Sequence, residues 1–158
     1  MNIIEIFTES LSLIFSFDKD LWEIILLSLY VSLVALIFAS IFGLLIGYYL
    51  ALRNFFFKNF ILIILNSLMG IPPVVVGLIV YFMFASGGPL GVLQLLYTPT
   101  AMIIAQVIII FPIVTSISHE IFDQNWREYK DQLRSINMPF FGVAFIITKH
   151  SYFLVITA

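Results

Sequence analysis

Apolar runs separated by short polar segments dominate the chain. A membrane-spanning α-helix needs about 20 consecutive, mostly apolar residues. Residues 21–52, 60–84 and 100–121 reach or exceed that length, and a further apolar stretch covers residues 140–158. The pattern predicts an all-α integral membrane protein, a polytopic helical bundle in which residues 21–158 form the transmembrane domain.

Composition supports this prediction. Of the 158 residues, 62% are hydrophobic and only 10% are charged. A soluble domain of this size could not bury so much apolar surface, because small domains leave a large fraction of their surface exposed. The formal net charge of −2 gives no reason to expect a nucleic-acid partner, whereas membrane lipid is an expected neighbour.

Residues 1–20 differ from the rest of the chain. They carry the acids Glu5, Glu9, Asp18 and Asp20, and they lack the basic start of a signal peptide. We therefore expect an N-terminal interfacial helix that lies along the membrane surface.

The basic residues predict the orientation of the chain, because Lys and Arg are enriched in short cytoplasmic loops. Arg53 and Lys58 lie in the first loop, and the second loop is uncharged. Arg127, Lys130 and Arg134 follow the third apolar stretch. This distribution places the N-terminus outside, and the first loop and the charged segment inside.

Two adjacent prolines interrupt the second apolar stretch. Because Pro72 and Pro73 lack a backbone N–H, the carbonyl groups of Leu68 and Met69 are expected to lose their helical partners. Such a break is tolerated only where protein or water covers it. Transporters often place broken helices on the transport path, where the start of a half-helix offers N–H groups to an anion; a packing kink without function is the alternative. The residues predicted for the translocation pathway are Asn66, Ser67, Gly70, Pro72, Pro73 and Gly77.

A glycine pair predicts a site of close helix contact. Gly43 and Gly47 lie one helical turn apart in the first apolar stretch. This small-xxx-small spacing permits two helix backbones to approach closely. Ordinary glycine usage in membrane helices is the alternative.

The chain offers little chemistry of its own. The central parts of the three complete stretches contain no ionisable residue, although ion-coupled transporters usually keep such residues within the membrane. His119 and Glu120 are neighbours, which should point in different directions on a helix, and we expect His119 at the membrane surface. Because no cluster has the spacing of a metal site or of a nucleophile and its base, we expect no catalytic residue, no metal and no cofactor. The energy for transport would come from another subunit.

A charged segment, residues 122–139, follows the third stretch. Its apolar residues recur at steps of three and four, which predicts a stripe on one face of a short surface helix. They are Trp126, Tyr129, Leu133, Ile136 and Phe140. Arg127 and Asp131 have the i, i+4 spacing of an ion pair, and Asn137 marks the helix end. The stripe fits either a helix in the headgroup region or a helix that docks to another protein.

The charged segment resembles the cytoplasmic coupling loop of bacterial ABC importers. That loop has the pattern E-A-A, three residues, G, nine residues, I-x-L-P. Asp131 takes the glutamate position, Asn137 the glycine position and Ile147 the isoleucine position. The two alanines, the leucine and the proline of the pattern are replaced in this chain.

The resemblance is closer upstream. "NSLMGIPPVVVGLIVYFMF", followed by "GGPLGVLQLLYTPTAMIIAQVIIIFPIV", is similar to the permeases of tungstate importers, which are relatives of the molybdate and sulfate permeases. The likeness begins near Leu21 and is most specific between Asn66 and Pro112.

The resemblance implies a permease subunit of the type I ABC-importer class in a bacterial cytoplasmic (inner) membrane. In that family two permease copies form the pore, cytoplasmic ATPase subunits hydrolyse ATP, and an extracytoplasmic binding protein delivers the oxyanion. Tungstate is the favoured substrate here, with molybdate or sulfate as alternatives. The implied ATPase-coupling residues are Tyr129, Asp131, Leu133, Arg134, Ile136 and Asn137.

Members of that family continue beyond the position of Ala158, so the resemblance also implies a permease that is incomplete at its C-terminus. A truncated, non-transporting membrane remnant is the alternative function. The uncharged spans disfavour an ion-coupled carrier.

Overall fold

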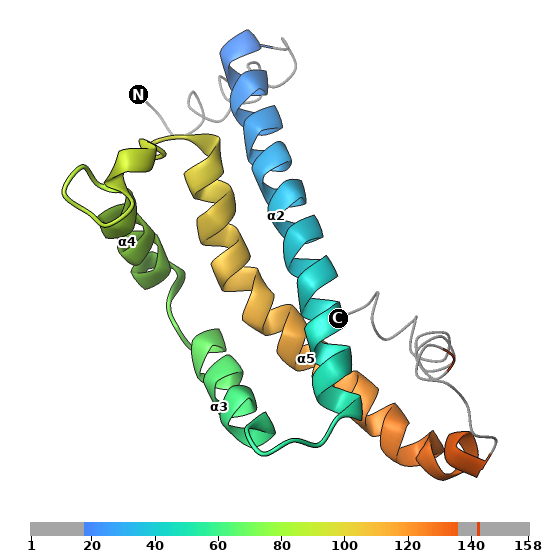
Figure 1. The fold of residues 1–158 in the computed structure, drawn as a ribbon. Coiled ribbons are helices and arrows are strands. Elements are labelled where there is room, and N and C mark those ends of the chain that lie inside the picture. Colours follow the sequence, from blue (N-terminus) through green and yellow to red (C-terminus); the bar gives the residue numbers. More distant parts are fainter. Residues whose placement is uncertain (1–17, 136–141, 143–158) are drawn as a thin grey trace, which may run out of the picture.

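The computed structural model describes residues 18–135 and residue 142. Its elements are α2 (Lys19–Leu52), α3 (Lys58–Met69), α4 (Pro73–Phe84), the short 3₁₀ helix η1 (Gly91–Leu93) and α5 (Pro99–Ser135). Within these residues every regular element is helical, which confirms the predicted all-α fold (Figure 1). Residues 1–17, the C-terminal apolar stretch except residue 142, and the predicted coupling residues Ile136 and Asn137 lie outside the described part.

Two helices are long and apolar enough to cross a membrane, and the pair α3 and α4 provides a third span if the two are counted together. α2 has 34 residues, or about 51 Å at 1.5 Å per residue. α5 has 37 residues, or about 55 Å. Both exceed the hydrocarbon thickness of about 30 Å, so each helix must tilt or project beyond it.

The start of α2 is fixed by a local cap. The backbone N–H of Leu21 donates to the Asp18 carboxylate at 3.1 Å, which satisfies one of the free donors at a helix start. α2 consequently begins at Lys19, two residues before the predicted transmembrane domain. Lys19 and Asp20, which we had assigned to an interfacial helix, therefore belong to α2.

α2 packs chiefly against α5, and the two helices run side by side (Figure 1). A stripe of small residues lies on the buried side of α2. The buried side of α2 includes a residue at every fourth position: Val31, Ala35, Ala39, Gly43, Gly47 and Ala51. Because lipid tails are as apolar as leucine, helices associate in membranes by close van der Waals packing, and small residues permit it.

The two glycines make the closest part of this contact. A Cβ atom at Gly43 would lie 2.9 Å from Val114 Cγ1 of α5. A Cβ atom at Gly47 would lie 2.8 Å from both Ser118 Cβ and the Thr115 carbonyl oxygen. The predicted role of Gly43 and Gly47 in close helix contact is therefore confirmed.

α4 is held to α5 by an apolar cluster at the other end of the molecule. Val76, Val80 and Phe84 of α4 are buried together with Ala101 of α5. The uncharged loop between the two helices folds back on α4, because the Leu90 N–H donates to the Met83 carbonyl at 2.9 Å. After this loop the chain enters α5, which runs back alongside α2 (Figure 1).

The glycine contact makes a prediction about stability. Gly47→Ala should lower the apparent unfolding temperature in detergent, because the added Cβ meets the backbone of α5 and overpacking costs about 1–3 kcal/mol. Gly77→Ala is the matched control, since a Cβ at Gly77 meets nothing within 4 Å and alanine favours the helix. Thermal unfolding of the two variants checks this. Equal stability of both variants would contradict the tight contact.

Candidate functional site

The second apolar stretch is broken at the two prolines, as predicted. α3 ends at Met69 and α4 begins at Pro73, and the two helices are bent by 99°. Pro72 precedes α4 with extended backbone angles, φ −58° and ψ 135°, and Pro73 occupies the first helical position, where a missing N–H is tolerated.

The hydrogen bonds at the break follow from the missing N–H groups of the prolines. Because Pro72 cannot donate to the Leu68 carbonyl, this carbonyl loses its usual helical partner, as predicted, and accepts instead from the Ile71 N–H at 3.2 Å. A tightened last turn, of the kind common at helix ends, supplies the new donor. On the other side of the break, the N–H groups of Val75 and Val76 donate to the Pro72 carbonyl at 2.9 and 3.4 Å. Since Pro73 has no N–H, the start of α4 offers an anion fewer donors than we expected.

The predicted pathway residues do not share one site. Ser67 donates its hydroxyl back to the Ile63 carbonyl at 2.8 Å, so its polar group is satisfied within α3. Asn66 lines a cleft between α3 and α5. Gly77 lies instead in a separate hollow with Tyr97 and Thr98. Gly70, Pro72 and Pro73 form the break itself.

The cleft between α3 and α5, which we call the polar cleft, has a volume of about 730 Å³. Most of its lining side chains are polar, and it extends to Met69 at the end of α3. The lining residues are Leu62, Asn66, Met69, Ser116, Ile117, His119, Glu120, Asp123, Gln124 and Arg127. Polar residues at such positions face a bundle interior or a water-filled cavity, so this is the strongest candidate for a functional site in the described part.

His119 and Glu120 both line the polar cleft. Although the two residues are neighbours on α5, the cleft is wide enough that both contribute to its lining. Within the described residues, His119 Nε2 and Ser116 Oγ are buried without a hydrogen-bond partner. Buried polar atoms of this kind usually bind water or a ligand, which is consistent with a hydrated cleft.

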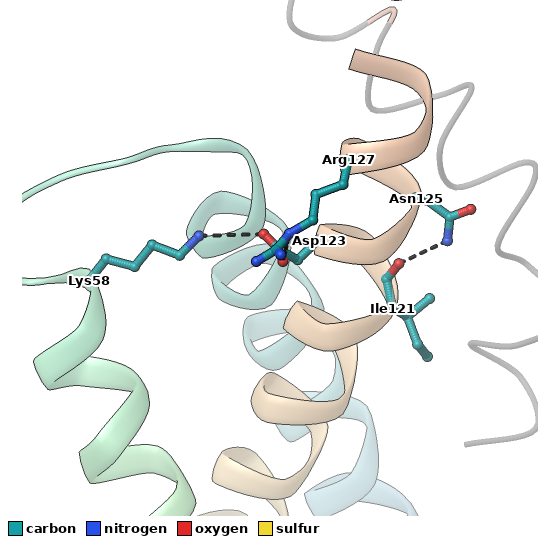
Figure 2. Close-up of polar contacts among 5 residues, drawn as sticks. All are labelled: Lys58, Ile121, Asp123, Asn125 and Arg127. Atoms are coloured by element: carbon teal, nitrogen blue, oxygen red, sulfur yellow. Dashed lines mark hydrogen bonds and ion pairs between the residues drawn. The ribbon is translucent and has the colours of Figure 1, made fainter. Parts of the chain in front are cut away.

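An ion cluster lies at one end of the polar cleft (Figure 2). Asp123 of α5 forms ion pairs with two cations. Its Oδ1 is 3.6 Å from Lys58 Nζ at the start of α3, and its Oδ2 is 2.7 Å from Arg127 Nε, one turn further along α5. The cluster thus joins the first loop region to the charged segment, which the predicted topology places on the same side of the membrane.

The predicted pairing of Arg127 with Asp131 is wrong, because Arg127 pairs with Asp123. Both carboxylates have i, i+4 spacing from Arg127. An i, i+4 ion pair on a helix is stronger when the acidic residue is N-terminal to the basic one. This preference alone favours Asp123 over Asp131, and Lys58 adds a second ion pair to the Asp123 carboxylate. Sequence reasoning had overlooked Asp123.

The charged segment is not a separate surface helix. α5 continues without interruption from the apolar stretch to Ser135, and its end extends beyond α2 and α3 (Figure 1). Asp131 is exposed near the end of this extension, whereas the side chains of Leu133 and Arg134 lie outside the described part.

The first residues of the predicted apolar stripe pack within the chain. Trp126 and Tyr129 contact the buried pair Ala51 and Phe122, where the end of α2 meets α5. Tyr48 packs edge-to-face on Phe122 with ring centroids 5.5 Å apart. The beginning of the stripe therefore packs within the chain and stabilises the contact between the end of α2 and α5.

Residues 39–158 match the family described as "Binding-protein-dependent transport system inner membrane component". The chain belongs to this family. The family is one of membrane transport components, which confirms a multi-pass helical permease and the resemblance found in the sequence.

The chain is similar to three known permease proteins. The tungstate uptake system permease protein TupB of Peptoclostridium acidaminophilum is 40% identical over 119 residues, which are 75% of this chain and 52% of the relative. A probable anion ABC transporter permease protein of Haloferax volcanii is 31% identical over 83% of this chain and 56% of its own length. TupB of Campylobacter jejuni is 30% identical over 84% of this chain and 55% of its own length. The chain thus spans about half the length of the relatives that it matches, and no solved structure gives a significant match.

The polar cleft makes a prediction about accessibility. Single cysteines at Asn66 or Gln124, which are exposed residues of the cleft lining, should react with a water-soluble thiosulfonate reagent in permeabilised membranes, because the polar lining holds water. A cysteine at Ala39, which is fully buried between α2 and α5, should stay unmodified. The 158 residues contain no native cysteine, so mass spectrometry reads the labelling directly. Protection of both cleft positions would show that lipid or protein fills the cleft.

Proposed function

We propose that this chain forms the membrane-spanning permease part of an ATP-driven ABC importer for an oxyanion, with tungstate as the favoured substrate. The observation that carries the proposal is the broken span beside a polar cleft, both within the region that matches the permease family. Broken helices of this kind provide the transport path in many transporters.

The relatives support the choice of substrate. Two of the three are named as tungstate uptake permeases, and the third as an anion transporter permease. Molybdate and sulfate remain the alternatives, because they are also tetrahedral oxyanions. The central parts of the three complete spans contain no acidic, basic or histidine residue that could couple transport to an ion gradient, which favours a separate energy source.

The proposed partners follow from this role. A cytoplasmic ATPase would hydrolyse ATP, an extracytoplasmic binding protein would deliver the anion, and a second copy of the permease would complete the pore. We assign the ATPase contact to the end of α5 and the residues after it. The extension from Phe122 to Ser135 is about 21 Å long, which is long enough to leave the membrane surface. The proposed coupling residues remain Tyr129, Asp131, Leu133, Arg134, Ile136 and Asn137.

Tyr129 and Asp131 differ in their surroundings. Tyr129 contacts the base of the extension, so we assign it a supporting role in coupling. Asp131 is exposed at the far end of the extension, where it can contact a partner directly.

Transport by the assembled importer tests the proposal. The full-length permease would be reconstituted in proteoliposomes with its ATPase and the binding protein, and anion accumulation measured by mass spectrometry. We expect ATP-dependent uptake of tungstate that excess sulfate inhibits weakly. Leu133→Asp should lower uptake at least about tenfold, since burying a leucine contributes about 1.5–3 kcal/mol, while insertion of the permease is unchanged. The control is Glu23→Gln, a substitution near the start of α2 and outside the charged segment. Absence of ATP-dependent uptake by the unaltered assembly would refute the proposal.

The proposed orientation, with the N-terminus outside, makes a separate prediction. In intact cells, a membrane-impermeant thiol reagent should label a cysteine at Ser86 but not one at Asn54 or Gln132. The reason is that Arg53, Lys58 and the charged segment belong to the cytoplasmic side. Labelling at Asn54 with protection at Ser86 would invert the topology.

A further inference from the structure

α3 is attached to the rest of the protein by few contacts. It is 12 residues long, and Leu65 is its one buried residue. Non-helical segments bound it on both sides, residues 53–57 before it and residues 70–72 after it. Much of the space between α3 and α5 is the polar cleft. A short rigid helix between two such joints can change its angle at low cost, because the joints absorb the change in backbone dihedral angles.

The ion pair between Lys58 and Asp123 is the polar contact that holds the start of α3 to α5 (Figure 2). The side chains are only 13% and 17% exposed. By comparison, Lys19 and Glu23 form a pair at 3.8 Å whose side chains are 87% and 67% exposed. Charges are screened much less when they are shielded from water, and removal of one partner from a shielded pair leaves the other uncompensated.

Asp123 also belongs to the part of the protein that would move with the ATPase. It lies on α5 just beyond the apolar stretch, and Arg127 of the extension holds its second oxygen at 2.7 Å. Asp123 thus lies at the start of the extension, where its carboxylate pairs with Lys58 of α3 on one side and with Arg127, one turn further along the extension, on the other. Any rotation of the extension about the α5 axis displaces this carboxylate and pulls on Lys58.

We propose that Asp123 is a positioning residue that transmits movement of the α5 extension to α3, and through α3 to the break at residues 70–72. The width of the polar cleft would change with the angle of α3. This inference rests on the proposed transport function, because it assumes an ATPase that displaces the extension. A coupling residue must interact differently with its partners in two states, and the pair meets this requirement if Lys58 and Asp123 separate in one of them.

The first test measures geometry and needs no transport. Spin labels at Ile63→Cys on the exposed face of α3 and at Glu128→Cys on the exposed extension would report the distance between the helices in lipid nanodiscs. In the full-length permease with Asp123, we expect a narrow distribution. Asp123→Asn has nearly the same size but no charge, and should give a broader distribution with a longer mean distance. An unchanged distribution would overturn the proposal, whether or not the protein transports tungstate.

The second test measures coupling in the reconstituted importer. Asp123→Asn should raise the ATP hydrolysed per anion imported about tenfold, within the usual range of allosteric coupling factors. Asp123→Glu keeps the charge and should restore most of the coupling. Lys58→Met combined with Asp123→Asn should be no worse than either single change, because both remove the same interaction.

Glu23→Gln removes the exposed ion pair of α2 and serves as the matched control. It should leave both the distance and the coupling ratio unchanged, since exposed pairs contribute little. Additive effects of the Lys58 and Asp123 substitutions, or normal coupling in Asp123→Asn, would overturn the positioning role. Failure of the unaltered importer to transport would instead count against the proposed function, and the distance measurement would still decide whether Asp123 holds α3.

Discussion

The contact between α2 and α5 is the interaction on which the rest of the structure depends. In a membrane there is little hydrophobic gain from bringing two apolar helices together, so their association requires close packing. The stripe that includes Ala39, Gly43 and Gly47 allows this. It fixes α5, and α5 in turn supplies one wall of the polar cleft and one half of the ion cluster. α3 and α4 are then positioned against a helix that is already held.

Local features of this fold were predictable from the sequence, and long-range ones were not. Apolar length identified the spans, and the missing N–H groups of Pro72 and Pro73 identified the break. Glycine spacing identified the face of α2 that makes a close helix contact, but it did not identify α5 as the partner. At the break, the Leu68 carbonyl accepts a hydrogen bond from the Ile71 N–H in place of its usual helical partner. This new bond depends on the conformation of the last turn of α3, which the missing proline N–H groups do not specify. Likewise, the end of an apolar run does not end a helix: charged residues are good helix formers, so α5 continues where hydropathy suggested a new element.

The ion cluster shows why the candidate site was only partly predictable. Arg127 has two carboxylates at the same spacing, and the local preference for an acid N-terminal to its base favours Asp123. The second cation of the cluster, Lys58, is far away in the sequence, so its part could not be predicted from the charged segment alone. A cleft between two helices likewise combines side chains from both, and their pairing in space is not encoded in either segment. Asn66 was predicted as a pathway residue because it lies near the prolines in the sequence. His119 and Glu120 were not, because they were judged from their positions on α5 alone, without the side chains of α3 that face them across the cleft.

The uninterrupted length of α5 has a mechanical consequence. Ser118, which meets Gly47, lies next to the midpoint of this 37-residue helix. Pro112 lies inside this helix, shortly before that contact. Because a proline cannot donate to the carbonyl four residues earlier, a helix bends most easily at such a position. The charged end of α5 and the end that carries Pro99, beside Ala101 and the α4 cluster, are therefore joined through a point of bending, and the angle between them can change while Ser118 stays against Gly47.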